Sequence, residues 1–208
     1  MDNLQHQSMV TDATIETPDA LGRDHFTISD LSIELRNAKQ REFLLENIPL
    51  NDKAAYRLMS EGKTVAVFQL ESSGMQRMLR DAKPSVFEDI IALVALYRPG
   101  PMDDIPTYIS VKNGQEKPDY LHPSLEGILE ETYGVVVFHE QVLRIVAVMT
   151  GCSLAEADEV RRSLGSPDSQ PEVRAWFYPA ARARGYDLVT IERVWEVLRA
   201  FASFGFCK

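Results

Sequence analysis

Two adjacent arginines, Arg161 and Arg162, have the residue type and placement that most clearly suggest binding chemistry in this chain. They lie near the end of a segment with helical periodicity that stops at Gly165. Neighbouring residues on a helix cannot both face the core, so at least one guanidinium points to solvent or to a ligand. The simpler alternative is that both cations stabilise the negative end of the helix dipole.

Arg98 is a second candidate for anion binding. It lies between an apolar helical segment and the sequence Pro99-Gly100-Pro101. Proline restricts the backbone of the preceding residue, so a guanidinium here is held in place with little entropy left to lose. The alternative role is structural, with the arginine bonding carbonyl groups at the end of the helix.

Polar residues Gln69, Ser72, Ser73 and Gly74 come directly before a segment with helical spacing. Backbone amides and hydroxyls at a helix N-terminus can bind a phosphate. The same serines can instead cap the helix, and Glu71 can complement its dipole.

His139, Glu140 and Gln141 open another expected helix, whose N-terminus could face a phosphate or a base. No second His, partner Cys or Ser-His-Asp pattern accompanies His139, which argues against proton transfer. Cys152 and Cys207 show neither metal-ligand spacing nor a disulfide framework. We expect them to be free thiols, packed as small apolar side chains.

The elements that position these residues are expected to be mostly helices. Apolar periodicity and capping patterns such as Ser85…Glu88 and Ser153…Glu156 set their boundaries. The expected helices cover residues 53–60, 86–96, 108–112, 141–150, 153–164, 173–184 and 190–201. Two more are expected, one marked by Met75, Met78 and Leu79 and one after Pro123. Two short runs rich in β-branched residues, 64–69 and 134–138, predict buried strands.

Composition indicates a globular protein. The chain has 208 residues, is 45% hydrophobic and carries a net charge of −9. Residues 1–140 hold 13 Lys+Arg against 23 Asp+Glu, whereas residues 141–208 hold 9 against 8. An acidic chain is not a typical duplex binder, so phosphate contacts are expected in the last third. The apolar runs are too short for a membrane span, and with the free cysteines this predicts a cytoplasmic protein.

Three motifs in this order and spacing resemble a known family. They are Val67-Phe68-Gln69-Leu70-Glu71-Ser72-Ser73-Gly74-Met75, Ala95-Leu96-Tyr97-Arg98-Pro99-Gly100-Pro101-Met102 and Phe138-His139-Glu140-Gln141-Val142. Over residues 48–208 the chain resembles the catalytic core of the bacterial DNA polymerase III alpha subunit, a family C DNA polymerase.

The resemblance implies roles for the candidate residues. Arg161 and Arg162 would meet the triphosphate of the incoming nucleotide, and Arg98 with the turn from Gln69 to Gly74 would shape the nucleotide pocket. Glu140, Gln141 and Lys208 would line the pocket or contact DNA. Enzymes of this family use Mg²⁺ held by aspartates on palm strands, in a Pro-Asp-Ile-Asp-Ile-Asp-Phe segment and before Phe-Leu-Gly. Neither segment occurs here, so we expect no metal ligands in this chain.

The chain departs from the family pattern at several positions. His139 stands where Tyr or Phe is more usual, and Cys207 stands where Asn is more usual. Ser166-Pro167-Asp168 replaces a run of lysines that follows the glycine in replicative members. These changes make the C-terminal part more similar to accessory or error-prone relatives.

Together these observations predict a mixed α/β but mainly helical fold. Residues 1–47 are expected to form a flexible lead-in, 48–102 the edge of a polymerase palm, and 103–208 an incomplete helical fingers region. The expected function is that of a fragment of a DNA-directed DNA polymerase, inactive alone, whose parent acts on primer-template DNA and deoxynucleoside triphosphates, with other replicase subunits as possible partners. The alternative is a non-catalytic helical module that binds nucleotide, DNA or another subunit.

Overall fold

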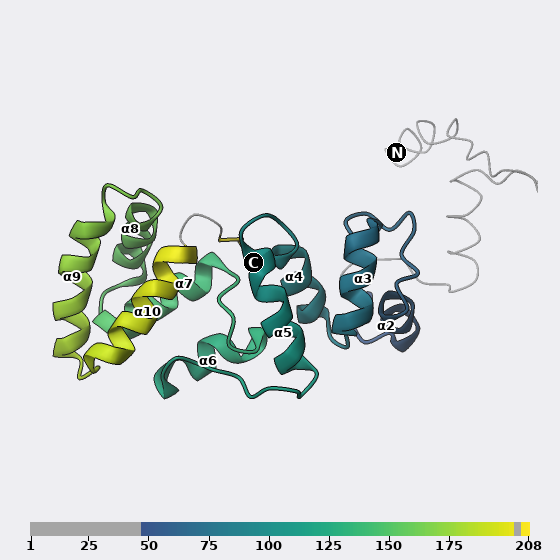
Figure 1. The fold of residues 1–208 in the computed structure, drawn as a ribbon, viewed down its shortest axis with the longest axis horizontal. Coiled ribbons are helices and arrows are strands. Elements are labelled where there is room, and N and C mark those ends of the chain that lie inside the picture. The colour runs from purple at the N-terminus through teal and green to yellow at the C-terminus, as the bar shows by residue number, and fades with distance from the viewer. Residues whose placement is uncertain (1–46, 202–204) are drawn as a thin grey trace, which may run out of the picture. The chain divides into compact units, whose positions relative to one another are not determined.

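A computed structural model describes residues 47–201 and 205–208 of the chain (Figure 1). The chain divides into two units, 1–49 and 50–208, and the second holds nearly all of the described residues. The predicted lead-in over residues 1–47 lies almost wholly outside them. None of the described helices is long and apolar enough to span a membrane.

Helices dominate the described part of the chain, which confirms the mainly helical prediction. The α-helices are α2 (Lys53–Ser60), α3 (Ser73–Ala82), α4 (Phe87–Leu96), α5 (Ile105–Lys112), α6 (Glu126–Leu129), α7 (His139–Thr150), α8 (Leu154–Leu164), α9 (Gln170–Ala183) and α10 (Leu188–Phe201). Short 3₁₀ helices are η2 (Pro101–Asp104), η3 (Pro123–Leu125) and η4 (Glu130–Thr132).

The strand predicted over residues 64–69 is wrong. Ala66 and Gln69 have φ angles of 63° and 68°, which no strand residue adopts. The segment is a pair of tight turns, in which the N–H of Val67 donates to the carbonyl of Thr64 and the N–H of Leu70 to that of Val67. The apolar, β-branched composition suggested a buried strand, but Phe68 is 81% exposed.

The strand predicted over residues 134–138 is also wrong, although the segment is extended. Its one strand-like pairing is an isolated parallel bridge between Phe138 and Phe206. The N–H groups of Val137 and Phe138 donate instead to Oε1 of Gln141, at 2.8 and 3.0 Å. A side chain thus takes the place of a neighbouring strand, so the described residues do not support the mixed α/β class.

The burial expected of residues 134–138 is nevertheless present for Val135 to Phe138. Val136 packs into a cluster formed with α6 to α10, whereas Val135, Val137 and Phe138 pack into a cluster formed with α3, α4 and α5. The extended segment therefore contributes side chains to two hydrophobic cores. Burial of such apolar side chains contributes about 1.5–3 kcal/mol each.

The capping predictions had mixed outcomes. The box at Ser153 is confirmed, because its N–H donates to Glu156 Oε2 at 2.8 Å and its Oγ accepts from the N–H of Glu156 at 3.3 Å. The box from Ser85 to Glu88 is wrong. Asp89 accepts the N–H of Ser85 at 2.8 Å, and α4 begins at Phe87. Asp89 is favoured because it is buried and bonds several other donors, whereas Glu88 is exposed.

Candidate functional site

Three element ends bring the predicted cations together. Arg98 lies just after α4, His139 is the first residue of α7, and Arg161 is in the last turn of α8. Burial lowers the pKa of His139, and the positive charge of Arg161 lowers it further. Arg98 acts in the same direction, so both guanidinium groups lie within electrostatic reach of the imidazole. We call Arg98, His139 and Arg161 the cationic cluster, after the charges of its two guanidinium groups.

Arg161 and Arg162 are both held by one carboxylate, Asp158. Arg161 donates to Asp158 Oδ1 through Nε and Nη2, each at 2.9 Å, and Arg162 Nη2 donates to Oδ2 at 2.5 Å. These hydrogen bonds, that of Arg161 foremost, lower the pKa of Asp158 despite an opposing burial effect. The Arg161 side chain is 20% exposed and that of Arg162 is 70% exposed. Arg161 is therefore the preorganised group, and Arg162 is the more mobile one.

Arg98 is fixed by the segment that follows residue 204. Its guanidinium carbon lies 4.9 Å from the centre of the Phe206 ring, a cation–π contact. The Phe206 carbonyl accepts the N–H of His139 at 2.8 Å, and the N–H of Phe206 donates to the Val137 carbonyl at 3.4 Å. Two chain segments far apart in sequence thereby lock one side of the cationic cluster.

Gln141 is a scaffold for the start of α7. Its Oε1 accepts two main-chain N–H groups, and its Nε2 donates to the Ile128 carbonyl at 3.1 Å and to Thr132 Oγ1 at 2.8 Å. These four bonds fill the hydrogen-bonding capacity of a primary amide. The side chain is buried and has no polar atom left for a ligand. Gln141 can thus line the predicted pocket only indirectly, by fixing the position of His139.

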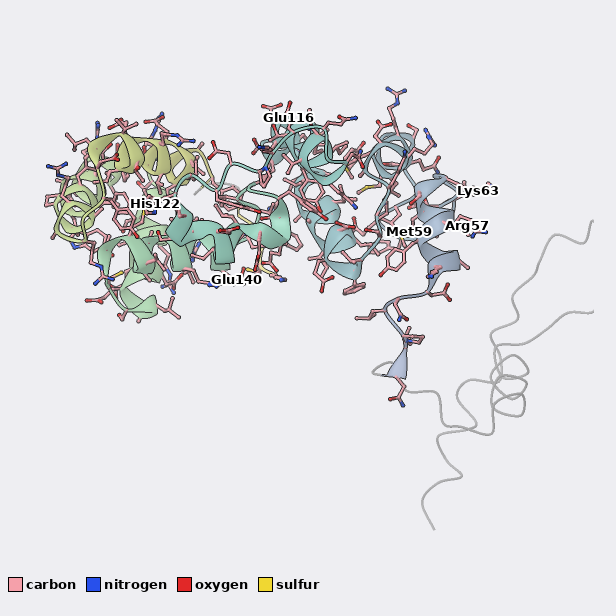
Figure 2. All side chains as sticks on the ribbon, turned by 90° about the horizontal axis from the view of Figure 1, so that it is seen from below. Arg57, Met59, Lys63, Glu116, His122 and Glu140 are labelled. Atoms are coloured by element: carbon pink, nitrogen blue, oxygen red, sulfur yellow. The ribbon has the colours of Figure 1, made fainter. Side chains whose placement is uncertain are left out.

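Glu140 and Lys208 meet each other beside the cationic cluster. Figure 2 shows Glu140 on the first turn of α7, and its Oε2 accepts the main-chain N–H of Lys208 at 3.2 Å. The Lys208 ammonium lies 2.5 Å from Glu131 Oε2 and 5.6 Å from the centre of the Phe138 ring. Both residues thus border the site, and their charges are partly balanced.

The turn from Gln69 to Gly74 approaches the site through the residue before Arg98. A Cβ atom added at Gly74 would lie 1.8 Å from the Tyr97 hydroxyl oxygen, so only glycine allows this approach. Ser72 caps α3, accepting the N–H of Met75 at 3.2 Å. Gln69 and Ser73 are exposed. The structure therefore joins this turn to Tyr97 and not to the arginines of α8.

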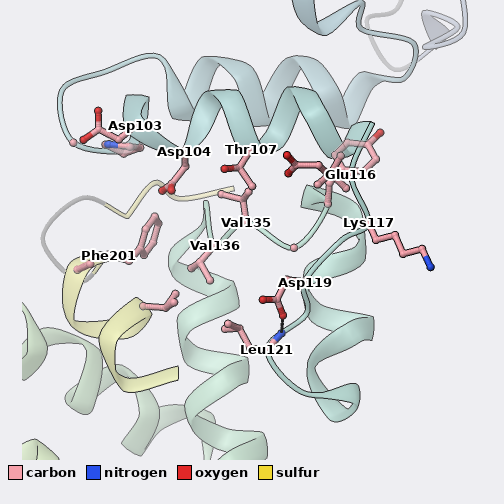
Figure 3. Close-up of a pocket in the computed structure, with 17 residues that line it drawn as sticks. Asp103, Asp104, Thr107, Glu116, Lys117, Asp119, Leu121, Val135, Val136 and Phe201 are labelled. Atoms are coloured by element: carbon pink, nitrogen blue, oxygen red, sulfur yellow. Dashed lines mark hydrogen bonds between the residues drawn. The ribbon is translucent and has the colours of Figure 1, made fainter. Parts of the chain in front are cut away.

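A cavity of about 590 Å³ has none of Arg98, His139 and Arg161 among its lining residues (Figure 3). Its lining includes the apolar residues Val135, Val136 and Phe201. Its charged lining residues are four acidic ones and one basic one, namely Asp103, Asp104, Glu116, Asp119 and Lys117. Burial, followed by the charge of Asp103, raises the pKa of Asp104. Such a lining repels phosphate, so this cavity is not the anion site.

The described residues do not fit a magnesium centre. Among residues 47–201 and 205–208, no three His, Cys, Asp or Glu side chains gather closely enough to hold a metal ion. Two-metal catalysis needs such carboxylates. No catalytic step through Mg²⁺ is therefore assigned to these residues.

Sequence reasoning missed two partners of the cationic cluster. Asp158 precedes Arg161 and Arg162 by three and four residues, a helical spacing that predicts ion pairs and could have been used. Phe206 gave no such signal, because its contact with Arg98 spans more than a hundred residues.

Comparison with known proteins identifies the family of the chain. The family model described as "Bacterial DNA polymerase III alpha subunit finger domain" matches residues 26–185. The chain is 40% identical over 219 residues to the DNA polymerase III subunit alpha of Halalkalibacterium halodurans, covering 99% of this chain and 20% of that protein. The proteins of the same name are 41% identical over 192 residues in Borreliella burgdorferi (91% and 17% covered) and 44% identical over 163 residues in Chlamydia muridarum (77% and 13% covered).

Fold and sequence thus define the class as a helical polymerase finger domain. The chain belongs to the bacterial DNA polymerase III alpha subunit family. It spans one fifth or less of the length of the curated relatives named above.

Proposed function

We propose that this chain supplies nucleotide-binding fingers to a DNA polymerase. The observation that carries the proposal is the convergence of Arg98, His139 and Arg161 from three separate elements. In this proposal Arg161 and Arg162 bind the triphosphate of an incoming deoxynucleoside triphosphate, and Arg98 shapes the nucleotide pocket beside them. Planar guanidinium groups bind phosphate in a bidentate manner, which supports this assignment.

Asp158 competes with the nucleotide for Arg161 and Arg162. One carboxylate balances one of the two guanidinium charges, so an excess positive charge remains beside Arg98. A triphosphate would exchange with Asp158 at the exposed Arg162 first, while Arg161 stays in place. His139, neutral because of its lowered pKa, would donate or accept a hydrogen bond without repelling either arginine.

The neighbouring segments have supporting roles in this proposal. The turn of Gln69, Ser72, Ser73 and Gly74 shapes the nucleotide pocket through its contact with Tyr97. Glu140 and Lys208 border the path of DNA. The finger-domain model matches residues 26–185, so in this proposal residues 48–102 belong to the fingers together with the helices that follow them.

Catalysis in this proposal belongs to the parent polymerase. Its Mg²⁺ ions and their aspartates, primer-template DNA and other replicase subunits complete the enzyme, in the cytoplasm. The 208-residue chain alone binds nucleotide but does not extend a primer. Its departures at His139, Cys207 and residues 166–168 support a role closer to accessory or error-prone synthesis.

A titration with a fluorescent deoxynucleoside triphosphate tests the proposal. Arg161→Ala should weaken binding at least about tenfold, since a charged hydrogen-bond partner contributes about 1.5–3 kcal/mol. Arg98→Ala should act in the same direction. Arg174→Ala is the matched control, because Arg174 forms an exposed ion pair with Glu192 on other helices. Equal affinities of Arg161→Ala and Arg174→Ala would refute the assignment.

A further inference from the structure

His139 and Cys207 contact each other. His139 stands where an aromatic residue is more usual in the family, and Cys207 stands where asparagine is more usual. Cys207 Sγ lies 3.6 Å from Nδ1 of His139, although the two are 68 residues apart. The main-chain bonds between Phe206 and residues 137 and 139 fix this approach on both sides of the pair. Main-chain hydrogen bonds between the two segments therefore hold the two side chains in contact.

Gly205 presses the backbone against the imidazole. A Cβ atom added there would lie 1.8 Å from Cδ2 of His139. The ring therefore packs on bare backbone, with its Nδ1 edge toward the thiol. Cys207 itself is exposed, so small reagents can reach its sulfur.

Geometry, and not the surrounding charge, places the imidazole to take a proton from sulfur, because its Nδ1 lies 3.6 Å from Sγ of Cys207. Burial and Arg161 lower the pKa of His139, Glu140 opposes them, and Arg98 and Asp158 contribute smaller effects of opposite sign. The imidazole is therefore a neutral proton acceptor at neutral pH. The thiolate is the nucleophilic form of cysteine, and passing the thiol proton to this imidazole would produce it.

We propose that Cys207 and His139 form a thiol–imidazole pair, in which hydroperoxides oxidise the Cys207 thiol to a sulfenic acid. Nδ1 of His139 takes the thiol proton, and the thiolate attacks one peroxide oxygen. The S–O bond forms as the O–O bond breaks. The leaving group, hydroxide from hydrogen peroxide or alkoxide from an organic hydroperoxide, takes the proton from the imidazolium to give water or an alcohol. The sulfur loses two electrons and the peroxide gains two.

The oxidation has a consequence for the cationic cluster. A sulfenic acid would stand beside His139, next to Arg98 and Arg161. It adds an oxygen where a triphosphate would bind, and we expect weaker nucleotide binding. This consequence rests on the proposed function, whereas the oxidation does not.

Dimedone trapping tests the oxidation directly. The 208-residue protein is treated with hydrogen peroxide at pH 7, and the dimedone adducts at Cys207 and Cys152 are quantified by peptide mass spectrometry. Cys152 is an internal reference, because it is half-buried against the α7–α10 core. Cys207 should be labelled at least about tenfold faster, since thiolate character and exposure govern such oxidation.

Substitution of the imidazole separates activation from mere exposure. His139→Phe introduces one of the aromatic residues more usual in the family and should slow labelling of Cys207 about tenfold, with Cys152 unchanged. His122→Asn is the control, because the His122 ring contacts Ser124 and Tyr186 and should not affect Cys207. Circular dichroism verifies that each variant is folded.

Equal labelling of Cys207 in the unmodified and His139→Phe proteins would overturn the proposal, as would labelling no faster than that of Cys152. The nucleotide titration, repeated on the oxidised protein, is read separately. An adduct at Cys207 with unchanged nucleotide affinity would overturn the regulatory consequence and leave the reactive pair established.

Discussion

Asp89 gives the sharpest prediction about stability. Its carboxylate is 1% exposed and joins the start of α4 to α5 and to the residue that follows η4. It accepts hydrogen bonds from the N–H groups of Ser85 (2.8 Å) and Val86 (3.2 Å), from the hydroxyls of Tyr108 (3.2 Å) and Tyr133 (3.1 Å), and from the Lys112 ammonium (3.0 Å). The side chain of Lys112 is itself only 7% exposed.

The substitution Asp89→Asn removes the charge and keeps the shape. The amide can still accept from one side and donate to the tyrosine oxygens on the other, so most of the loss comes from the unbalanced Lys112. Removing one partner of a buried ion pair costs about 3–5 kcal/mol. Lys112 keeps a hydrogen bond to Ser85 Oγ at 3.3 Å and lies 5.9 Å from the Tyr133 ring centre, which favours the lower limit. We therefore expect a loss of about 3 kcal/mol.

Urea unfolding followed by circular dichroism, in a double-mutant cycle, measures this loss. Lys112→Met removes the cation but keeps an aliphatic chain. The double variant Asp89→Asn/Lys112→Met should be at least about 1.5 kcal/mol more stable than the sum of the two single losses implies, because neither charge is left buried. Additive losses, or a loss below about 1 kcal/mol for Asp89→Asn, would show that this network does not hold α4 and α5 together.

Further predictions concern pH, packing, a helix start and activity. Burial raises the pKa of Asp89, but its hydrogen bonds outweigh that effect and the net pKa is lowered. The stability advantage over Asp89→Asn is therefore complete above about pH 4 and is lost as the pH falls through the lowered pKa. Urea unfolding at several pH values would show this. Gly74→Ala should destabilise by about 1–3 kcal/mol through overpacking, and a second change, Tyr97→Phe, should recover much of it in thermal unfolding. Gln141→Leu orphans two buried N–H groups and should cost about 2–4 kcal/mol, whereas the matched Gln76→Leu, which removes one exposed bond, should be nearly neutral. Primer extension by the 208-residue chain with Mg²⁺ should give no product, and extension that persists in preparations shown to be free of other polymerases would contradict the assigned division of labour.

Helices were predictable because their ends carry local signals. Asp52, Ser72 and Ser153 cap the helices that were expected after them, since short polar side chains bond the first free N–H groups. The turns and the extended segment that stand in place of the two expected strands were not predictable, because the signal for those strands is composition alone. Residues 64–69 close into turns at two positive φ angles, and Gln141 satisfies the N–H groups that a strand neighbour would have taken.

The candidate site was predictable by residue type and not by arrangement. Arg98, His139 and Arg161 were each identified from their neighbours in sequence, yet their convergence depends on how α4, α7 and α8 pack. Motif resemblance assigned Arg98 and Arg161 to one nucleotide site but gave His139 no role in it. The contact between His139 and Cys207 spans 68 residues, and no local pattern encodes it. Comparison with the family motifs showed that His139 and Cys207 are both unusual residues, but it did not indicate that they are in contact.

Photocrosslinking tests the central claim most directly, because it reports where a nucleotide lies. The 208-residue protein would be irradiated with a deoxynucleoside triphosphate that carries an azide on its γ-phosphate, and the labelled peptides identified by mass spectrometry. The account predicts crosslinks at the start of α7 and the end of α8, around His139 and Arg161, which excess unlabelled nucleotide abolishes. Competed crosslinks on the outer faces of α9 and α10, around Arg174 and Arg199, with none around the cationic cluster, would contradict it.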